Sequence, residues 1–351
     1  MDIPDDRWLD ATRSLAAQGS DGQPVLAADD VALWREAGYC VVDGIFDEAL
    51  IDSVIDHALA RFPAPGTDDA AAIADFGSEY VFPSNNPAFN DITLEPRLLT
   101  AVAQLLDRNP NDLRLTQSDL WPKYGRPVTA GRQDNQDQRI HVDYPNHTLA
   151  HPSPWHRPEA VEMILYYSDV DAAGGPTAVV PRSGRDDPAY PWPIVDTPGV
   201  GDLDYVNDRE SAEAYLTDRR PELTDWRQSL YERERYVRYR KGTLVMYRHD
   251  VWHRGTPMTD GALRLAHNMT FRTAEAEWIS TLHSGWAWKA YRPNKYIERL
   301  IATASLDQRA VLGFPQPDSP YWCEETIAAV EARHGVFGMD MTPYRDAIAS
   351  R

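Results

Sequence analysis

The stretch that organises this chain is QRIHVDYP at residues 138–145. In a β-strand, residues two positions apart point to the same face, so His141 and Asp143 would share one space. One imidazole and one carboxylate make up two thirds of the facial triad that binds non-haem Fe(II) and leaves three coordination positions open. The candidate for the second histidine is His253, in YRHDVWHRG at residues 247–255.

A histidine two residues before an acid has little meaning alone. Ten histidines and 54 acidic residues among 351 positions produce roughly one such pair by chance. The interpretation therefore depends on the rest of the chain.

Composition excludes several classes of function. Hydrophobic residues make up 42% of the chain, which is enough for a globular core. A net charge of −19 argues against nucleic acid and anionic membranes as partners. No apolar run is long enough to span a bilayer and the N-terminus has no signal-peptide pattern, so we expect a cytoplasmic protein. Cys40 and Cys323 lie far apart and are expected to be free thiols, and the sequence indicates no oligomeric state.

Short strands separated by Gly and Pro turns predict a barrel or jelly roll, in an α+β fold with flanking helices. The expected strands are residues 113–121, 162–167, 177–180, 243–247 and 263–272. The expected helices are residues 27–35, 47–62, 96–106, 294–302, 322–333 and 343–350, with a long loop at 63–92. We therefore predict one domain, comprising a helical part (about 1–110), a jelly-roll core (about 111–275) with an insert (about 184–240), and a helical extension (about 276–351).

The insert between the strands is acidic and contains the charged run YERERY at residues 231–236. It is interpreted either as a surface excursion with a solvated charged strand or as a lid over the mouth of the barrel.

Several segments together resemble the phytanoyl-CoA dioxygenase family of Fe(II)/2-oxoglutarate oxygenases. The similarity covers roughly residues 28–272, and the order and spacing of its parts are more specific than any single motif. The segments that carry it are the helix–Gly-Tyr–strand–helix pattern at 29–62, HVD at 141–143, DVDAAGGPTAVVPRSG at 169–184, and WHRG at 252–255 followed by Arg264.

The resemblance implies a set of site residues. His141, Asp143 and His253 would bind the metal. Arg264, eleven residues after the distal histidine, would bind the far carboxylate of 2-oxoglutarate, for which its planar fork is well matched. Further contacts to 2-oxoglutarate would come from Lys123, Gln117 and Thr256. The chain departs from the family at Gly255, where a small polar residue is common.

Alternatives remain for some of these roles. His249 competes with His253 as the distal ligand, and Arg272 is a rival of Arg264. His147, His151 and His156 lie in a Pro-containing segment that favours a loop over a second metal site. The residues that follow the ligands and are expected to line the substrate pocket are Tyr144, Asn146 and Trp155.

The predicted function is an Fe(II)/2-oxoglutarate-dependent oxygenase that uses O2 to oxidise a C–H bond of a small molecule and releases succinate and CO2. Because Asp143 is present, hydroxylation or a related oxidation is expected, since halogenases of this type resemble the same site with Gly or Ala at that position. The alternatives are a non-oxidative cupin-like metalloenzyme, such as an isomerase or lyase, and a binding protein without chemistry.

Overall fold

The larger of two β-sheets supports the fold in the computed structural model, which describes residues 3–15, 23–73, 80–129, 131, 136–279 and 293–351. Its six strands run in the order β2-β3-β8-β5-β10-β4, and all neighbours are antiparallel except β2 with β3. The strands are β2 Thr12–Arg13, β3 Tyr39–Asp43, β4 Leu113–Tyr124, β5 Ala160–Tyr166, β8 Leu244–Tyr247 and β10 Leu263–Thr273.

A smaller sheet, in the order β1-β7-β6-β9, packs against the larger one. Apolar side chains of both sheets meet in one buried cluster, with Val41 and Val245 from the larger sheet and Val179 and Val237 from the smaller. Two packed, mainly antiparallel sheets with flanking helices confirm the predicted α+β class and jelly-roll core. The smaller sheet contains β1 Trp8–Leu9, β6 Thr177–Val179, β7 Arg235–Val237 and β9 His253–Gly255.

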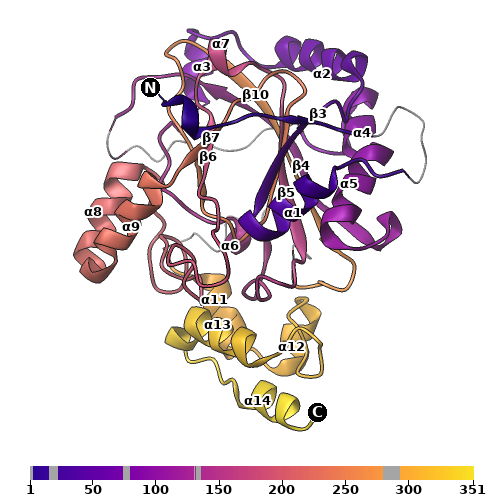
Figure 1. The fold of residues 1–351 in the computed structure, drawn as a ribbon. Coiled ribbons are helices and arrows are strands. Elements are labelled where there is room, and N and C mark those ends of the chain that lie inside the picture. The colour runs from indigo at the N-terminus through magenta and orange to yellow at the C-terminus, as the bar shows by residue number, and fades with distance from the viewer. Residues whose placement is uncertain (1–2, 16–22, 74–79, 130, 132–135, 280–292) are drawn as a thin grey trace.

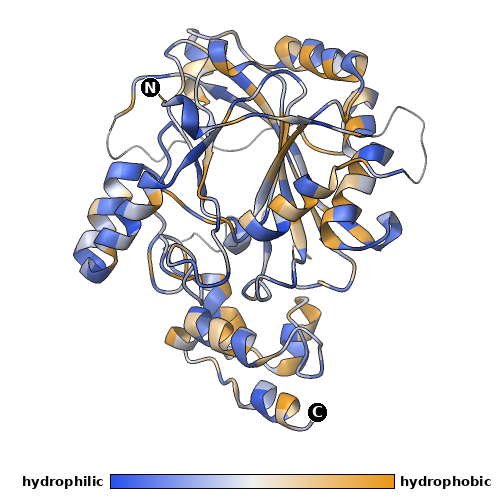
Figure 2. Cartoon of the chain, in the orientation of Figure 1, coloured by the Kyte–Doolittle hydropathy of each residue, from blue (hydrophilic) through white to orange (hydrophobic). Residues whose placement is uncertain are grey.

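Helices α2, α4 and α5 lie together on one flank of the larger sheet (Figure 1). Their apolar residues form a second buried cluster with the outward-facing residues of β5 and β8, for example Val54 and Leu98 with Met163 and Met246. Figure 2 shows hydrophobic stretches interspersed with hydrophilic ones along the central strands and the flanking helices, as expected for layers that bury one face. The helices before the HVD motif are α1 Ala28–Ala37, α2 Glu48–Arg61, α3 Asp68–Ala72, α4 Pro87–Thr93 and α5 Pro96–Leu106.

The loop expected at residues 63–92 is only partly correct, because α3 and α4 lie within it. Both helices begin at local caps. The Thr67 side chain accepts a hydrogen bond from the Ala70 amide, and the Asn86 side chain accepts one from Ala88, with Pro87 in the first turn. Polar residues and prolines suggest a loop in this segment of the sequence. In the structure, some of these residues cap and begin helices α3 and α4.

The charged run at residues 231–236 is not a solvated strand. It forms the end of α9 and the start of β7, which pairs with β6 inside the smaller sheet. Glu234 is buried and forms an ion pair with buried Arg254 of β9. The predicted insert therefore contributes a core strand, and its helices α8 Arg209–Arg219 and α9 Thr224–Glu232 lie on the flank away from α2 (Figure 1).

The C-terminal helices pack against the end of the jelly roll that carries the HVD motif (Figure 1). Arg333 donates a 2.8 Å hydrogen bond to the carbonyl of Thr148, and the His334 Nε2 lies 2.9 Å from the carbonyl of Leu149. The extension thus holds the segment that follows the motif. The remaining helices are α6 Tyr144–His147, α7 Val170–Ala173, α11 Tyr296–Thr303, α12 Leu306–Val311, α13 Glu324–His334 and α14 Thr342–Ala349, with 3-10 turns at Asp5–Arg7, Pro110–Asp112, Pro221–Leu223 and Gly335–Phe337.

Within the described part of the chain, no helix has the length and apolar character needed to cross a membrane. Both cysteines are free, as expected, and Cys40 is fully buried in the core beneath α1 and α2.

Candidate active site

Three side chains converge where the two sheets meet. The ligand atoms of His141, Asp143 and His253 all lie within 4.8 Å of one another. The His253 Nε2 is 3.2 Å from Oδ2 of Asp143, and the His141 Nε2 is 3.5 Å from Oδ1. The side chains are 6–15% exposed, so the cluster is buried but reachable. Two imidazoles and one carboxylate at this spacing can hold one metal ion and leave positions open.

The backbone brings the two histidines together in a way that differs from the predicted strand. His141 and His253 form an isolated antiparallel bridge, while Asp143 stands at the start of helix α6 and has helical torsion angles. The amides of Asp143 and Tyr144 both donate to the carbonyl of His249. The side chains of His141 and Asp143 therefore share one space because of this turn, not because of strand alternation.

Hydrogen bonds to the backbone orient both imidazoles for metal binding. The Nδ1 atom of His141 lies 3.0 Å from the carbonyl of Arg139, and Nδ1 of His253 lies 3.1 Å from that of Val251. A carbonyl only accepts, so each Nδ1 carries the proton and each Nε2 presents a lone pair. Burial lowers the pKa of His141 well below its usual value, which favours the neutral form that a metal ligand needs.

The carboxylate of Asp143 is held by two neutral donors. Tyr247 of β8 donates to Oδ2 at 3.0 Å, and the Asn146 amide donates to Oδ1 at 3.2 Å. Burial acts to raise the pKa of Asp143, but in the metal-free protein a protonated His253, through its charge and hydrogen bond, brings this pKa below its ordinary value, and a bound cation would take the place of that proton. Carboxylate oxygens facing two unprotonated Nε2 atoms form a set that a divalent cation would stabilise, so the residues fit a ferrous ion.

Arg264 lies on β10, at one end of the inner face of the larger sheet. It is buried, its Nη1 donates to the carbonyl of Gly175, and its guanidinium lies 5.7 Å from the centre of the Tyr166 ring. Its Nε atom has no hydrogen-bond partner among the described residues. A buried guanidinium with an unpaired donor is suited to an anionic ligand.

Lys123 sits directly opposite Arg264 on the neighbouring strand β4. It is buried, and its ammonium donates to the carbonyl of Thr256 at 3.0 Å. The Thr256 hydroxyl donates to the carbonyl of Pro176 at 2.6 Å. The structure thus brings Arg264, Lys123 and Thr256 to one end of the site.

Gly255 occupies the position where the family commonly has a polar residue, and the packing explains it. A Cβ atom here would lie 2.5 Å from Oε1 of Gln138 and 3.4 Å from Nζ of Lys123. The Gln138 Oε1 accepts a 2.8 Å hydrogen bond from the Gly255 amide. Any side chain at residue 255 would displace this contact.

Gln117 is not brought to Arg264. It lies six residues before Lys123 on β4, its amide donates to Asp119 at 2.8 Å, and its Oε1 lies 3.2 Å from the Thr270 hydroxyl of β10. Burial raises the pKa of Asp119 to about 6. Gln117 therefore belongs to the opposite end of the inner face.

The three residues expected in the substrate pocket are separated by the structure. Asn146 contacts Asp143 directly. Tyr144 is fully buried, and its hydroxyl donates to the carbonyl of Ile194 at 2.6 Å. Trp155 donates to the carbonyl of Arg35 at the end of α1 and packs against the guanidinium of Arg248. Of the three, only Asn146 has a contact to a metal ligand.

His249 is buried behind the metal-binding residues and supports them through its backbone carbonyl. Burial lowers its pKa to about 4. His151 is also buried, with Nε2 3.1 Å from the amide of Ile194. Neither belongs to the group of three residues that could hold a metal, which is the one such group in the described part of the chain.

Sequence reasoning missed Glu162. It is buried on β5 beside the metal-binding residues, and Oε1 lies 3.5 Å from Nε2 of His147. Burial, with the charge of Asp143, raises the pKa of Glu162 well above its usual value. The signal available in the sequence is the single acid within the otherwise apolar strand AVEMILY at residues 160–166, since buried acids are rare without a role.

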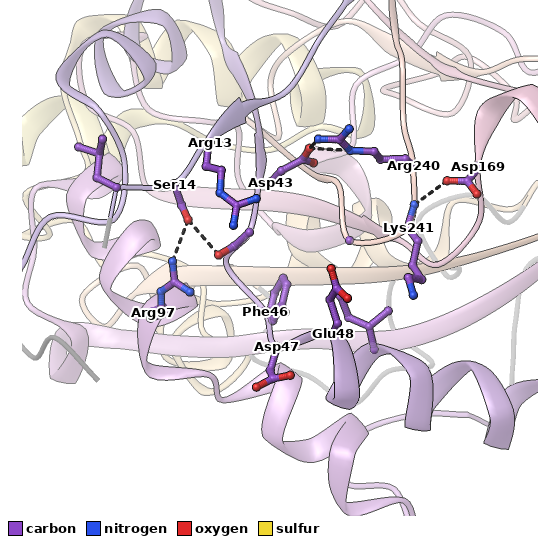
Figure 3. Close-up of a pocket in the computed structure, with 14 residues that line it drawn as sticks. Arg13, Ser14, Asp43, Phe46, Asp47, Glu48, Arg97, Asp169, Arg240 and Lys241 are labelled. Carbon is purple, nitrogen blue, oxygen red and sulfur yellow. Dashed lines mark hydrogen bonds and ion pairs between the residues drawn. The ribbon is translucent and has the colours of Figure 1, made fainter. Parts of the chain in front are cut away.

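A separate pocket of about 980 Å³ lies outside the jelly roll, beside β2 and β3 (Figure 3). Arg240 forms an ion pair with Asp43, and Arg97 donates to the Ser14 hydroxyl, which donates in turn to the carbonyl of Gly44. None of the three candidate metal ligands lines this pocket. It is therefore not part of the site described above.

A sequence model of the phytanoyl-CoA dioxygenase (PhyH) family matches residues 34–266, which include His141, Asp143, His253 and Arg264. The chain belongs to this family. As a phytanoyl-CoA dioxygenase family member it is an enzyme that depends on iron and 2-oxoglutarate and acts on a small molecule. No curated relative matches the chain.

Several solved structures are similar to this family member. SnoK, a non-haem α-ketoglutarate-dependent carbocyclase from nogalamycin biosynthesis, shares 16% identity over 74% of this chain and 89% of its own, with a TM-score of 0.47. HygX from Streptomyces hygroscopicus, solved with nickel and 2-oxoglutarate, shares 15% identity over 71% and 87%, with a TM-score of 0.45. EvdO2 from Micromonospora carbonacea var. aurantiaca, complexed with 2-oxoglutarate, shares 12% identity over 71% and 91%, with a TM-score of 0.46.

Proposed function

We propose that this enzyme hydroxylates, or otherwise oxidises, an unactivated C–H bond of a small organic molecule while 2-oxoglutarate is converted to succinate and CO2. The observation that carries the proposal is the combination of a His/Asp/His cluster that could hold a metal with the buried guanidinium of Arg264 on the larger sheet. The first can hold Fe(II), and the second can anchor a dicarboxylate.

His141, Asp143 and His253 would hold the iron. Bound together, iron, 2-oxoglutarate and O2 supply the oxidising power, and the protein supplies position and environment. The carbonyls of Arg139 and Val251 fix the imidazole tautomers, and Tyr247 and Asn146 fix the carboxylate. Because Asp143 fills the third protein position, the proposal is hydroxylation or a related oxidation rather than halogenation.

Arg264 would bind the carboxylate of 2-oxoglutarate that is remote from the metal. The unpaired Nε supports this role, since a bidentate contact to a carboxylate would satisfy a donor that is otherwise buried without a partner. Lys123, opposite Arg264, adds a second positive charge at the same end. Thr256 supports this end through its carbonyl, which accepts from Lys123.

The rival function is a non-oxidative cupin-like metalloenzyme, an isomerase or lyase, with the same three ligands. Such an enzyme has no need for a buried guanidinium that matches a second carboxylate. The position of Arg264 therefore favours the oxygenase.

The test is 2-oxoglutarate turnover by the iron-loaded enzyme in air, measured as succinate release, against pools of small organic molecules. At least one pool is expected to stimulate succinate release several-fold above the uncoupled rate. The Asp143→Ala variant is the control and should remain at background. Product formation that proceeds without 2-oxoglutarate, or full activity in Asp143→Ala, would contradict the proposal.

A further inference from the structure

The inner face of the larger sheet carries polar groups at the level of the metal-binding residues. Glu162 on β5 is directly opposite Tyr247 on β8, whose hydroxyl reaches Asp143. Directly paired residues in a sheet project to the same face. Glu162 therefore points into the space beside the metal-binding residues, and the proximity of Asp143 and His147 agrees with this direction.

One oxygen of Glu162 is used by the protein and the other is not. Oε2 accepts a hydrogen bond from Thr270 of β10, which fixes the side chain. Oε1 is buried and makes no hydrogen bond within the described residues, and His147 Nε2, at 3.5 Å, is too far for a good one. Leaving a buried carboxyl oxygen unpaired is costly, so such an atom commonly marks a site for a ligand.

A second hydrogen-bond acceptor without a partner among the described residues, Oδ1 of Asn146, lies close to Asp143. Asn146 donates its amide nitrogen to Asp143, which leaves its carbonyl oxygen as the free end, and that Oδ1 is buried without a partner among the described residues. Glu162 Oε1 and Asn146 Oδ1 are thus two acceptors near the Asp143 carboxylate that lack a donor among the described residues. A bound molecule with hydrogen-bond donors would satisfy both.

This part of the inner face is distinct from the end that carries Arg264 and would hold 2-oxoglutarate. Thr270, which holds Glu162, lies six residues along β10 from Arg264, a separation of roughly 20 Å at the usual rise of a strand. Because 2-oxoglutarate would extend from the metal toward Arg264, it would not reach Glu162, so Glu162 would be left to contact the molecule that is oxidised.

We propose that Glu162 and Asn146 bind a hydrogen-bond donor of the substrate, a hydroxyl or an amine, next to the C–H bond that is oxidised. This inference rests on the proposed function, because it identifies Glu162 as a substrate-binding residue of that same site. It excludes purely hydrocarbon groups as the part of the substrate that faces the metal.

The experiment uses the enzyme loaded with Zn(II) and 2-oxoglutarate. Because Zn(II) is not redox-active, this form binds ligands without oxidising them. Three ring probes of matched size are titrated in ligand-observed NMR: cyclohexanol, cyclohexylamine and methylcyclohexane. The wild type should bind the alcohol or the amine more tightly than methylcyclohexane, which has no donor. Glu162→Leu should weaken that binding about tenfold or more, as expected for loss of a hydrogen bond to a carboxylate, and leave methylcyclohexane unchanged.

Glu162→Gln separates the two kinds of donor, because it keeps an acceptor but cannot ionise to pair with a bound ammonium group. Binding of cyclohexanol should change only a few-fold in this variant, whereas binding of cyclohexylamine should be lost. The control is Glu275→Gln, an exposed carboxylate paired with Arg108, which should bind all probes as the wild type does. Glu162→Leu should also unfold at a temperature no lower than the wild type, because it removes an unsatisfied group, whereas a purely structural glutamate predicts a clear fall.

Failure of this inference and failure of the proposed function have different signatures. If the wild type does not bind 2-oxoglutarate in the presence of metal, the proposed function fails. If the affinity for 2-oxoglutarate differs by less than twofold among the wild type, Glu162→Leu and Glu162→Gln, the metal and 2-oxoglutarate site is intact in all three proteins. Equal behaviour of the three probes with the wild type, or binding of the donor probes that is unaffected by both substitutions, then overturns the role of Glu162.

Discussion

His141 and His253 pair through two backbone hydrogen bonds of 2.9 Å, one in each direction, although they come from distant parts of the chain. Their ring centres lie 4.5 Å apart as a result. The spacing of the two imidazoles is therefore set by backbone pairing between two segments of the jelly roll, and it exists before a metal binds. Loss of either imidazole should affect the metal more than the fold.

The distal ligand is tested by comparing His253→Ala with His249→Gln. Substitution of a residue that only supports a ligand costs about 10- to 100-fold in metal affinity, so loss of a ligand should cost at least as much. His253→Ala should therefore retain little iron after anaerobic reconstitution. His249→Gln should retain about one iron ion per chain, which is the quantity measured in both variants. The opposite pattern would make His249 the ligand.

The anchor for 2-oxoglutarate is tested by Arg264→Lys. A lysine keeps the charge but loses the two-pronged geometry that matches a carboxylate, so the KM for 2-oxoglutarate should rise about tenfold or more. Arg272→Lys is the matched control at the other end of the same strand, where Nη1 of Arg272 donates to the carbonyls of Thr273 and Ala274. An unchanged KM for 2-oxoglutarate in Arg264→Lys would contradict the assignment of Arg264 as the residue that binds the remote carboxylate. A larger rise in KM in Arg272→Lys would assign that role to Arg272.

The buried ion pair next to His253 should be important for stability. Arg254 contacts Glu234 through Nε and Nη2, the latter at 3.2 Å, and it also pairs with Asp137. Arg254→Ala leaves buried Glu234 without a counter-charge, which should lower the free energy of unfolding by about 3–5 kcal/mol in urea titrations.

The control for this prediction is Arg345→Ala, which breaks a pair with Glu331 at 2.6 Å whose side chains are 48% and 49% exposed. Its cost should be below about 1 kcal/mol. Similar losses in Arg254→Ala and Arg345→Ala would show that burial does not determine the contribution of these pairs.

The stability of the protein should depend on pH through buried His267. Burial lowers the pKa of His267 to about 3, and its ring stacks on Phe89 and contacts Ser118 and Tyr167. Between about pH 3 and 6.5 the unfolded chain binds a proton at this residue and the folded chain does not, so this histidine makes stability fall as the pH falls.

Between pH 7 and pH 5 the loss attributable to this residue should be about 2 kcal/mol. The measurement is urea unfolding of the wild type and His267→Gln at both pH values. The variant should lose less stability than the wild type over this range. Equal losses in the two proteins would show that His267 is not held neutral by burial.

Much of the fold could be predicted because its strands alternate regularly. Residues 263–272 were expected as a strand and form β10, Leu263–Thr273. By contrast β7 lies in a charged segment, and its place in the smaller sheet depends on pairing with β6 and on the contact between Glu234 and Arg254. Such tertiary contacts leave no local pattern in the sequence.

The convergence of His141, Asp143 and His253 was predictable because their residue types and spacing are specific, and the roles of these residues and of Arg264 stay predictions. Glu162 was not, because its direction depends on the register of β5 against β8. Gln117 was expected near 2-oxoglutarate, but its position six residues from Lys123 along β4 carries it to the other end. Trp155 follows the motif closely in sequence, yet the chain turns after α6 and carries it to the end of α1.

The central claim is that three side chains hold one ferrous ion to which 2-oxoglutarate binds. Its most direct test is anaerobic titration of the apoprotein with Fe(II) and 2-oxoglutarate while the visible absorption is recorded. We predict one iron per chain and a weak charge-transfer band that requires both iron and 2-oxoglutarate and is absent in His253→Ala and Asp143→Ala. Iron binding without any band on addition of 2-oxoglutarate, or a band that persists in both variants, would contradict the account.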